Sequence, residues 1–492
     1  MLIFRLLRFR WGLLVCIVAL SIRTVALADG PSLTTTTTSV ESTATIDAHT
    51  PVELVVDHFI DAQLQTLQLQ PAGQISDASL LRRLSLDLVG RIPTNQEVHD
   101  FVSSDDADKR ARWIDQLLSS TGFARHQIDE LDALLMYPDG GNLRDYLSKA
   151  IDQDRRWDQM FRELIIADQS DDAMGASAFL KARLKDTDKM TNEVSVRFFG
   201  VNVSCAQCHD HPLVSDWTQD HYYGMKSFFS RTFENGGFLA EREYGSVEYT
   251  TTRGEQRKAK LMFLTGEVLD EPTRQEQSEQ DKQAERKRLE EFKKDKKPPP
   301  APEYSRRARM AEVGLGESGR YWLAKSLANR LWARFFGFGL VMPVDQMHSE
   351  NPASHPELLE WLARDLMTHN FDMKRTIRGL VLSRAYSRNS RWTQGDSMPE
   401  PSTFAVSRVR PLTPLQLGAS LKVATLDPNA IDLSVPQAER NKRADDAAQA
   451  GRGLSSRFEM PREDLQISVS EALFLNNNPQ VVRDLLSGGL VN

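Results

Sequence analysis

Apolar residues recur every three or four positions along most of the chain, which is the spacing of an amphipathic helix. In the N-terminal half this pattern is clearest in VELVVDHFIDAQLQTL, LLRRLSLDLVG, KRARWIDQLLSS and WDQMFRELIIADQ. Gly90 is placed to end a helix, and Thr94 with Glu97 forms a capping box at the start of the next one. The sequence therefore predicts a series of helices from about residue 52 onward.

The C-terminal half has helix signals of its own. SGRYWLAKSLANRLWARFFG is strongly amphipathic. Ser354 with Glu357 predicts a capping box, and Asp372 and Thr413 stand where further helices should start. Because this half has its own start signals, we expect a second helical domain over residues 318–492.

Two stretches between these halves break the helical pattern. EREYGSVEYTT and KAKLMFLTGE have β character, which predicts a small β-hairpin with a long connection. Residues 274–317 begin with a charged, glutamine-rich run that ends in three prolines, which predicts a solvated helix leading into a linker. The expected fold class is mainly α, with helical domains over residues 51–273 and 318–492 and a hairpin excursion and charged linker between them.

The first 28 residues have the features of a secretory signal peptide. Three arginines precede an apolar run from Trp11 to Ile22, and Ala26 and Ala28 supply the small residues before a cleavage site. This pattern predicts a secreted or periplasmic protein cleaved after Ala28, with an uncleaved anchor as the alternative. No later run is long and apolar enough to cross a bilayer, so we expect no integral membrane segment in the mature chain. The threonine- and serine-rich residues 29–50 predict a flexible spacer.

The charge balance excludes one class of partner. The formal net charge of the chain is −7. Loss of a signal peptide with four arginines and no acidic residue lowers it to about −11. Nonspecific nucleic-acid binding requires a basic surface, so we expect no nucleic-acid partner. Walker, dinucleotide-binding, G-x-S-x-G and H-E-x-x-H motifs are absent from the sequence, so nothing in it indicates a hydrolase or a nucleotide enzyme.

Cysteine usage singles out one stretch of the chain. Of the 3 cysteines, Cys16 lies in the expected signal peptide, and Cys205 and Cys208 stand directly before His209 as C-x-x-C-H. Two thiols at this spacing can form thioethers with the vinyl groups of one haem, and the adjacent histidine can ligate its iron. We therefore expect haem c, with His209 as the proximal ligand.

The second axial ligand and the cofactor itself have alternatives. His211, His221 and Met225 are candidates for a further ligand. Zinc or another transition metal can instead bind the cysteines and histidines of CAQCHDH, although four ligands within seven residues would strain a tetrahedral site. A redox-active or structural disulfide without any cofactor is the third interpretation.

The motifs also resemble a known family. FFGVNVSCAQCHDHPLVSDWTQDHYYGMKSFF is similar to the signature of the planctomycete secreted cytochrome-like domain. LANRLWARFFGFGLV and RPLTPLQLGASL resemble the planctomycete-specific domain of unknown function that follows it. The resemblance covers most of residues 55–490 and implies a secreted protein whose activity is unsettled. By position it carries over Cys205, Cys208 and His209, followed by His211.

These features together predict a secreted cytochrome-like protein that uses one haem c for electron transfer or haem-based redox chemistry, with an extracytoplasmic redox partner. The alternative is a non-haem extracellular module for binding or assembly, in which CAQCHDH forms a metal site or a disulfide. No residue pattern identifies a catalytic group.

Overall fold

The computed structural model describes residues 46–458 apart from residues 48, 168–169, 172, 211–213, 274–276 and 427–433, together with Pro479 and, at Ala438, the backbone alone. The expected signal peptide, most of the expected spacer and His211 lie outside the described residues. None of the described helices combines the length and the apolar character that crossing a membrane requires.

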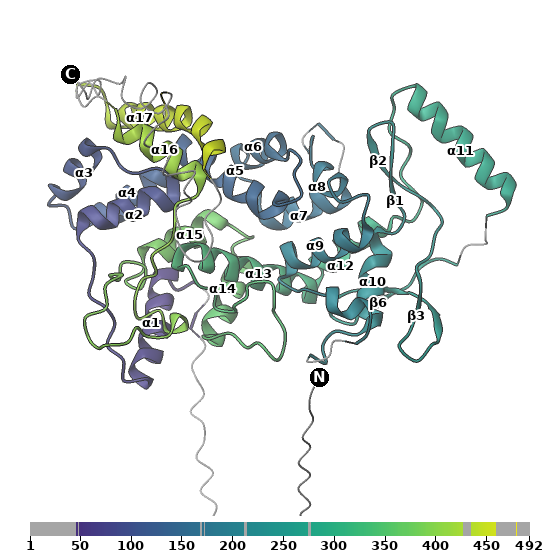
Figure 1. The fold of residues 1–492 in the computed structure, drawn as a ribbon, viewed down its shortest axis with the longest axis horizontal. Coiled ribbons are helices and arrows are strands. Elements are labelled where there is room, and N and C mark those ends of the chain that lie inside the picture. Colours follow the sequence, from purple (N-terminus) through teal and green to yellow (C-terminus); the bar gives the residue numbers. More distant parts are fainter. Residues whose placement is uncertain are drawn as a thin grey trace, which may run out of the picture. The chain divides into compact units, whose positions relative to one another are not determined.

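The described chain is mainly helical, so the predicted fold class is confirmed (Figure 1). The helices before the C-x-x-C-H stretch are α1 (Val52–Thr66), α2 (Asp77–Val89), α3 (Asn95–Val102), α4 (Lys109–Leu118), α5 (Thr121–Met136), α6 (Arg144–Asp152), α7 (Trp157–Ile166), α8 (Ala178–Lys181) and α9 (Thr187–Phe199). Those after it are α10 (Gln219–Phe229), α11 (Glu279–Lys294), α12 (Arg306–Leu315), α13 (Glu317–Phe336), α14 (Pro356–Thr368), α15 (Met373–Leu382), α16 (Pro414–Ala424) and α17 (Gln437–Gly451). Short 3-10 turns are η1 (Ser204–Gln207), η2 (Pro401–Thr403) and η4 (Arg452–Arg457).

Helix boundaries follow the sequence signals in most places. α2 ends at Gly90 in the left-handed conformation, and Thr94 and Glu97 form the expected capping box at the start of α3. The side chains of Asp372 and Thr413 cap α15 and α16. Local hydrogen bonding therefore determines these ends, as the sequence predicts.

The predicted capping box of Ser354 and Glu357 is wrong. α14 begins at Pro356, with His355 in the N-cap position and no side-chain cap. Ser354 is held by the preceding loop, because its N–H donates to the Leu340 carbonyl at 2.7 Å and its hydroxyl lies 3.1 Å from His355 Nδ1. The helix therefore starts one residue later than expected.

The β excursion consists of three local pairs, so the expected single hairpin with a long connection is wrong. The antiparallel pairs are β1 (Thr232–Asn235) with β2 (Phe238–Glu241), β3 (Glu248–Thr250) with β4 (Gln256–Lys258), and β5 (Leu261–Met262) with β6 (Val268–Leu269). Each pair closes on a nearby turn that contains glycine with positive φ, at Gly236 and Gly237, Gly254 and Gly266. Such turns let each run pair with its own neighbour rather than with a distant strand.

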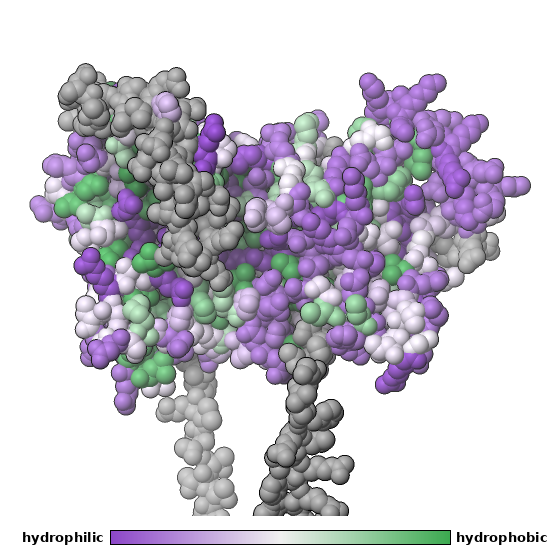
Figure 2. All heavy atoms as spheres, in the orientation of Figure 1, coloured by the Kyte–Doolittle hydropathy of each residue, from purple (hydrophilic) through white to green (hydrophobic). Residues whose placement is uncertain are grey.

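The expected linker contains two different helices. α11 has no buried residue, and its surface is hydrophilic (Figure 2), in line with the expected solvated helix. α12 is different, because Met310 and Ala311 are fully buried and the helix packs against α7 and α13. The linker expected to reach residue 317 therefore ends before Arg306. The sequence of α12 is rich in arginine, so its buried apolar positions do not stand out as an amphipathic pattern.

Buried side chains from both helical halves form one continuous hydrophobic core among the described residues. α1 packs against α14 and α15, α7 against α12, and α9 against α13. Isolated β-bridges also join Gln74 with Arg388 and Val201 with Gln346. The two halves are therefore interlocked, which their separate start signals did not indicate.

Charged side chains are buried where the halves meet. Arg91 is 1 % exposed and lies 2.8 Å from both Glu97 and Asp445. Burial alone would lower the pKa of Arg91, but the two carboxylates raise it above its usual value. The Arg91 guanidinium outweighs the effect of burial on Glu97 and lowers the pKa of that carboxyl. We call Arg91, Glu97 and Asp445 the buried junction.

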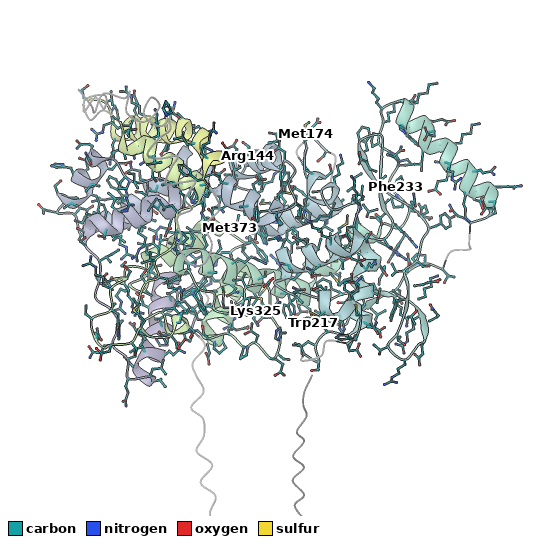
Figure 3. The ribbon with its side chains drawn as sticks, in the orientation of Figure 1. Arg144, Met174, Trp217, Phe233, Lys325 and Met373 are labelled. Atoms are coloured by element: carbon teal, nitrogen blue, oxygen red, sulfur yellow. The ribbon has the colours of Figure 1, made fainter. Side chains whose placement is uncertain are left out.

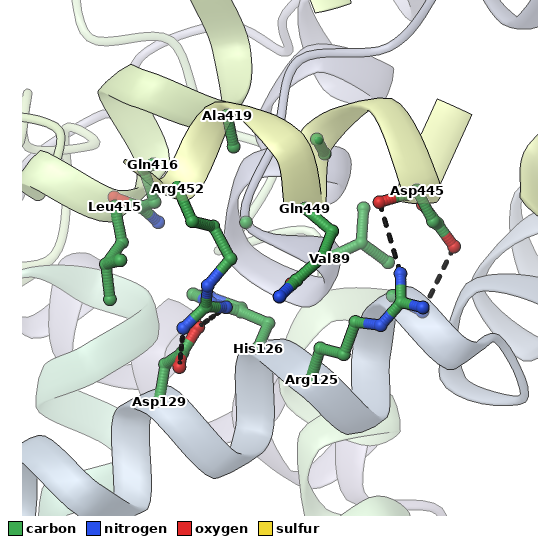
Figure 4. A pocket seen from close by; sticks show the side chains of 13 residues that line it. Val89, Arg125, His126, Asp129, Leu415, Gln416, Ala419, Asp445, Gln449 and Arg452 are labelled. Carbon is green, nitrogen blue, oxygen red and sulfur yellow. Dashed lines mark hydrogen bonds and ion pairs between the residues drawn. The ribbon is translucent and has the colours of Figure 1, made fainter. Parts of the chain in front are cut away.

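Further contacts beside the buried junction join α5 to α17 and η4 (Figure 4). Arg452 pairs with Asp129, and Arg125 donates to the Asp445 carbonyl at 3.2 Å. A cavity of about 30 Å³ remains between α5, α16 and α17. A cavity of that size holds little more than a water molecule, so packing rather than ligand binding explains the cluster.

Candidate functional site

The C-x-x-C-H stretch is fixed where it leaves α9. Gly200 ends that helix with φ of 69°, a conformation that favours glycine. A Cβ at this position would lie 2.8 Å from Met347 Sδ, and the Gly200 carbonyl accepts a hydrogen bond from the Met347 N–H at 3.0 Å. The C-terminal half therefore holds the chain in place just before Cys205.

The 3-10 turn η1 anchors the stretch through its inner face. Val203 and Ala206 are fully buried. Asn202 Oδ1 accepts hydrogen bonds from the Ser204 N–H at 3.0 Å and from its hydroxyl at 2.6 Å. An asparagine bonded to the backbone two residues later stabilises a turn. This arrangement leaves the other face of the turn to solvent.

The three predicted ligands lie on that exposed face. Cys205 and Cys208 are exposed free thiols. His209 follows directly and is exposed as well. The structure therefore brings all three predicted site residues to the surface on one short segment. We call residues 204–209 the CAQCH turn.

The imidazole of His209 is oriented by one hydrogen bond. Its Nδ1 lies 2.7 Å from the carbonyl oxygen of Asp210. A carbonyl can only accept, so Nδ1 carries the proton and donates it. In the neutral ring Nε2 then keeps its lone pair. A histidine whose Nδ1–H is bound by a carbonyl is a common arrangement for metal ligation through Nε2.

Helix α10 supports the CAQCH turn from behind. The Gln219 N–H donates to Asp210 Oδ1 at 2.9 Å, and Gln219 Nε2 donates to the Cys208 carbonyl at 3.2 Å. The Tyr223 hydroxyl donates to the Gln207 carbonyl at 3.0 Å. Two of these three bonds reach backbone carbonyls and the third reaches Asp210, so neither the thiols nor the imidazole is used to hold the turn.

Tyr223 is itself held by packing. Its ring stacks on Tyr249 with centroids 4.1 Å apart. Burial raises the pKa of Tyr223, with further contributions from Asp188 and Cys208. The phenol is therefore neutral near pH 7 and keeps the proton that it donates to Gln207. Gln219, Tyr223 and Asn202 were not predicted as site residues, because a hydrogen bond to a backbone carbonyl leaves no motif in the sequence.

His221 caps the N-terminus of helix α10. The Thr218 N–H donates to its Nδ1 at 3.3 Å, and the two residues form the capping box of α10. Nδ1 is therefore an acceptor, so the neutral ring carries its proton on Nε2. Burial also lowers the pKa of His221. Neither ring nitrogen offers a free lone pair while this cap is intact.

The remaining candidate ligands are placed differently. Met225 is fully buried in the hydrophobic core, on the helix that supports the turn. His211 lies outside the described residues. Among the residues that are described, no group of three histidine, cysteine, aspartate or glutamate side chains is arranged to hold a metal ion. The structure thus brings together Cys205, Cys208 and His209 and leaves Met225 apart.

Two family models match the chain. Residues 55–234 match PSCyt2, described as a protein of unknown function (DUF1549). Residues 306–458 match PSD1, described as a protein of unknown function (DUF1553). These matches support the resemblance to the planctomycete domain pair, and the second begins at Arg306, the first residue of α12. No curated protein and no solved structure matches the chain.

Proposed function

We propose that this protein is a secreted cytochrome-like redox protein in which Cys205 and Cys208 attach one haem c and His209 ligates its iron. The observation that carries the proposal is the CAQCH turn, where two free thiols and an imidazole with an available Nε2 are all exposed. The name of the PSCyt2 model, which covers this turn, points in the same direction. Export and an extracytoplasmic redox partner belong to the same proposal.

The residues of the CAQCH turn fit the chemistry of haem c. Haem c attaches through two thioethers at C-x-x-C-H spacing and supplies one-electron redox chemistry when bound. The protein contributes two free thiols, which react as nucleophiles, and a histidine whose tautomer is set by the Asp210 carbonyl. Gln219 and Tyr223 hold the backbone so that the side chains keep their direction.

In this proposal α10 would supply no further ligand to the iron. His221 caps the helix through Nδ1, and Met225 is buried in the core. Ligation by either would require a helix cap or a core contact to break. We therefore propose that, among the residues that the structure describes, His209 alone would ligate the iron.

Intact mass and absorption spectra test the proposal. The protein is produced in a host that matures a control cytochrome c. We expect a mass gain of about 616 Da and a Soret band. Replacement of both Cys205 and Cys208 by serine should abolish the gain. His209→Ala should keep the mass gain but shift the spectrum, because the iron loses its proximal ligand.

The matched control is His99→Ala, because the His99 side chain is 74 % exposed on α3 and lies outside the CAQCH turn. This variant should keep both the mass and the spectrum. Three other results would replace the proposal with the non-haem alternative: a mass lower by about 2 Da, as for a disulfide, a bound metal ion in native mass spectrometry, or an unmodified dithiol.

A further inference from the structure

A second feature lies beside the CAQCH turn. An open cleft of about 750 Å³ forms between the N-terminal ends of α10 and α13, the β5–β6 turn, and α14. Its lining combines three aromatic residues, Trp217, Tyr321 and Trp322, with three carboxylates, Asp216, Glu317 and Glu360. Neither the proposed haem attachment nor the family matches assign a role to this cleft.

The aromatic rings are held in fixed positions. Trp217 is 3 % exposed, and its ring meets that of Trp322 edge-on, with centroids 6.2 Å apart. The Tyr321 hydroxyl donates to the Glu360 carboxylate. Trp322 and Tyr321 are partly exposed. The cleft therefore presents two aromatic rings whose orientation is set by buried or bonded neighbours.

The side chains that line the cleft include more carboxylates than cations. Its only side chain that is always cationic is Arg364, whose Nε lies 3.9 Å from Glu360 Oε1. Asp216 accepts hydrogen bonds from the Ser349 N–H at 2.8 Å and hydroxyl at 2.7 Å. Glu317 is exposed in the first turn of α13 and forms no ion pair with any residue that the structure describes. The cleft thus carries excess negative charge, and one carboxylate lacks a counter-ion.

A neighbouring lysine shows what these rings attract. Lys325 Nζ lies 5.7 Å from the centroid of the Tyr321 ring and 5.9 Å from that of Trp322. Lys325 and Trp217 are labelled in Figure 3, and Lys325 is not part of the cleft lining. Ammonium groups within about 6 Å of such rings are attracted by their electron-rich faces. The protein therefore already places one cation against this pair.

We propose that the cleft binds a small organic cation with apolar substituents, of the quaternary ammonium class. Trp322 and Tyr321 contact the alkyl groups and the positive charge, and Glu317 supplies the counter-charge. Aromatic rings combined with carboxylates are the usual chemistry for recognising such cations. Excess negative charge disfavours an anion at the same place. The site is independent of haem attachment.

The test uses choline and its neutral isostere, 3,3-dimethyl-1-butanol. Titration of the full-length protein is followed by calorimetry and by tryptophan fluorescence. We expect saturable choline binding, with affinity for the isostere weaker by about tenfold or more, because only choline carries the charge. Raising the salt concentration should weaken choline binding and leave the isostere unaffected.

Three variants locate the site. Glu317→Gln and Trp322→Leu should each weaken choline binding severalfold. Lys325→Gln should strengthen it, because a competing positive charge is removed from the same rings. The control is Glu279→Gln, which changes a glutamate in the first turn of another helix whose side chain is 80 % exposed. Circular dichroism checks that Trp322→Leu is folded. If that variant does not fold, Glu317→Gln still tests the proposal.

Any of three results would overturn the proposal. The first is the absence of saturable choline binding to the wild-type protein. The second is equal affinity for choline and the isostere, which would indicate a cleft that recognises shape alone. The third is binding of a neutral saccharide in place of choline, unchanged in Glu317→Gln, which would assign the aromatic rings to a different ligand.

Discussion

The buried junction and the CAQCH turn use polar groups in opposite ways. At the buried junction, Arg91, Glu97 and Asp445 bind one another through their side chains and are removed from water. At the turn, the supporting bonds mainly reach backbone carbonyls, and the reactive side chains remain exposed. At the buried junction each charge is thus paired with another side chain, whereas at the turn the thiols and the imidazole are left free on a supported backbone.

The strongest test of this contrast is Asp445→Ala. The substitution leaves Arg91 buried with only one carboxylate, and it removes the acceptor of the Gly122 N–H. Breaking a buried pair by removing one partner costs about 3–5 kcal/mol. We expect a loss of that order in the free energy of unfolding, measured by urea denaturation.

Asp446→Ala is the matched control for this substitution. Asp446 is the next residue and pairs with Arg125, but its side chain is 51 % exposed. Exposed pairs contribute about 1 kcal/mol or less, so this variant should be nearly as stable as the wild type. Equal losses in the two variants would show that the buried junction is not a special source of stability.

A pH titration extends the contrast to histidines. His355 is 4 % exposed, and its Nε2 has no hydrogen-bond partner among the described residues, whereas His209 is exposed. Burial lowers the pKa of His355 to about 4. The unfolded chain then binds a proton more readily than the folded one between that value and about 6.5. Stability should therefore fall as the pH decreases through this window.

The size of the effect follows from the same linkage. One such group changes the free energy of unfolding by at most about 1.4 kcal/mol per pH unit. Denaturation curves of His355→Leu between pH 4.5 and 7 should show a shallower dependence than the wild type. His99→Gln, at an exposed position, should follow the wild-type curve. An unchanged slope in His355→Leu would mean that this histidine binds a proton as readily in the folded protein as in the unfolded chain.

The smallest expected effect concerns the support of the CAQCH turn. Tyr223→Phe removes the hydrogen bond to the Gln207 carbonyl and keeps the ring stacked on Tyr249. The loss of stability should be below about 1 kcal/mol, because water can replace the bond. Alkylation of the apo-protein thiols should nevertheless become faster. Tyr137→Phe, at a residue that is 59 % exposed, is the control and should change neither quantity.

The sequence predicts local structure well and long-range structure poorly. The capping box at Thr94 and the caps at Asp372 and Thr413 depend on residues within three positions, so they can be recognised directly. The burial of α12 and the pairing of Arg91 with Asp445 depend on partners that are far away in the chain. No local pattern specifies such partners, which is why interlocking of the halves was missed.

The same division applies to the candidate site. Cys205, Cys208 and His209 were identified from spacing alone, and the structure places all three on one exposed surface. The role of His221 could not be found in this way, because a histidine that caps a helix and one that ligates iron have the same local sequence. Only the direction of the Thr218 N–H separates the two.

The contact between α1 and the C-terminal half also constrains the order in which the protein can fold. Gln63 on α1 donates to the carbonyl of Ser354, 291 positions later in the chain. At a synthesis rate of about 5–20 residues per second, the interval between making these two residues is on the order of 15–60 s. During that time the apolar face of α1 has no native partner. α1 therefore reaches its native packing only after α14 and α15 have been synthesised.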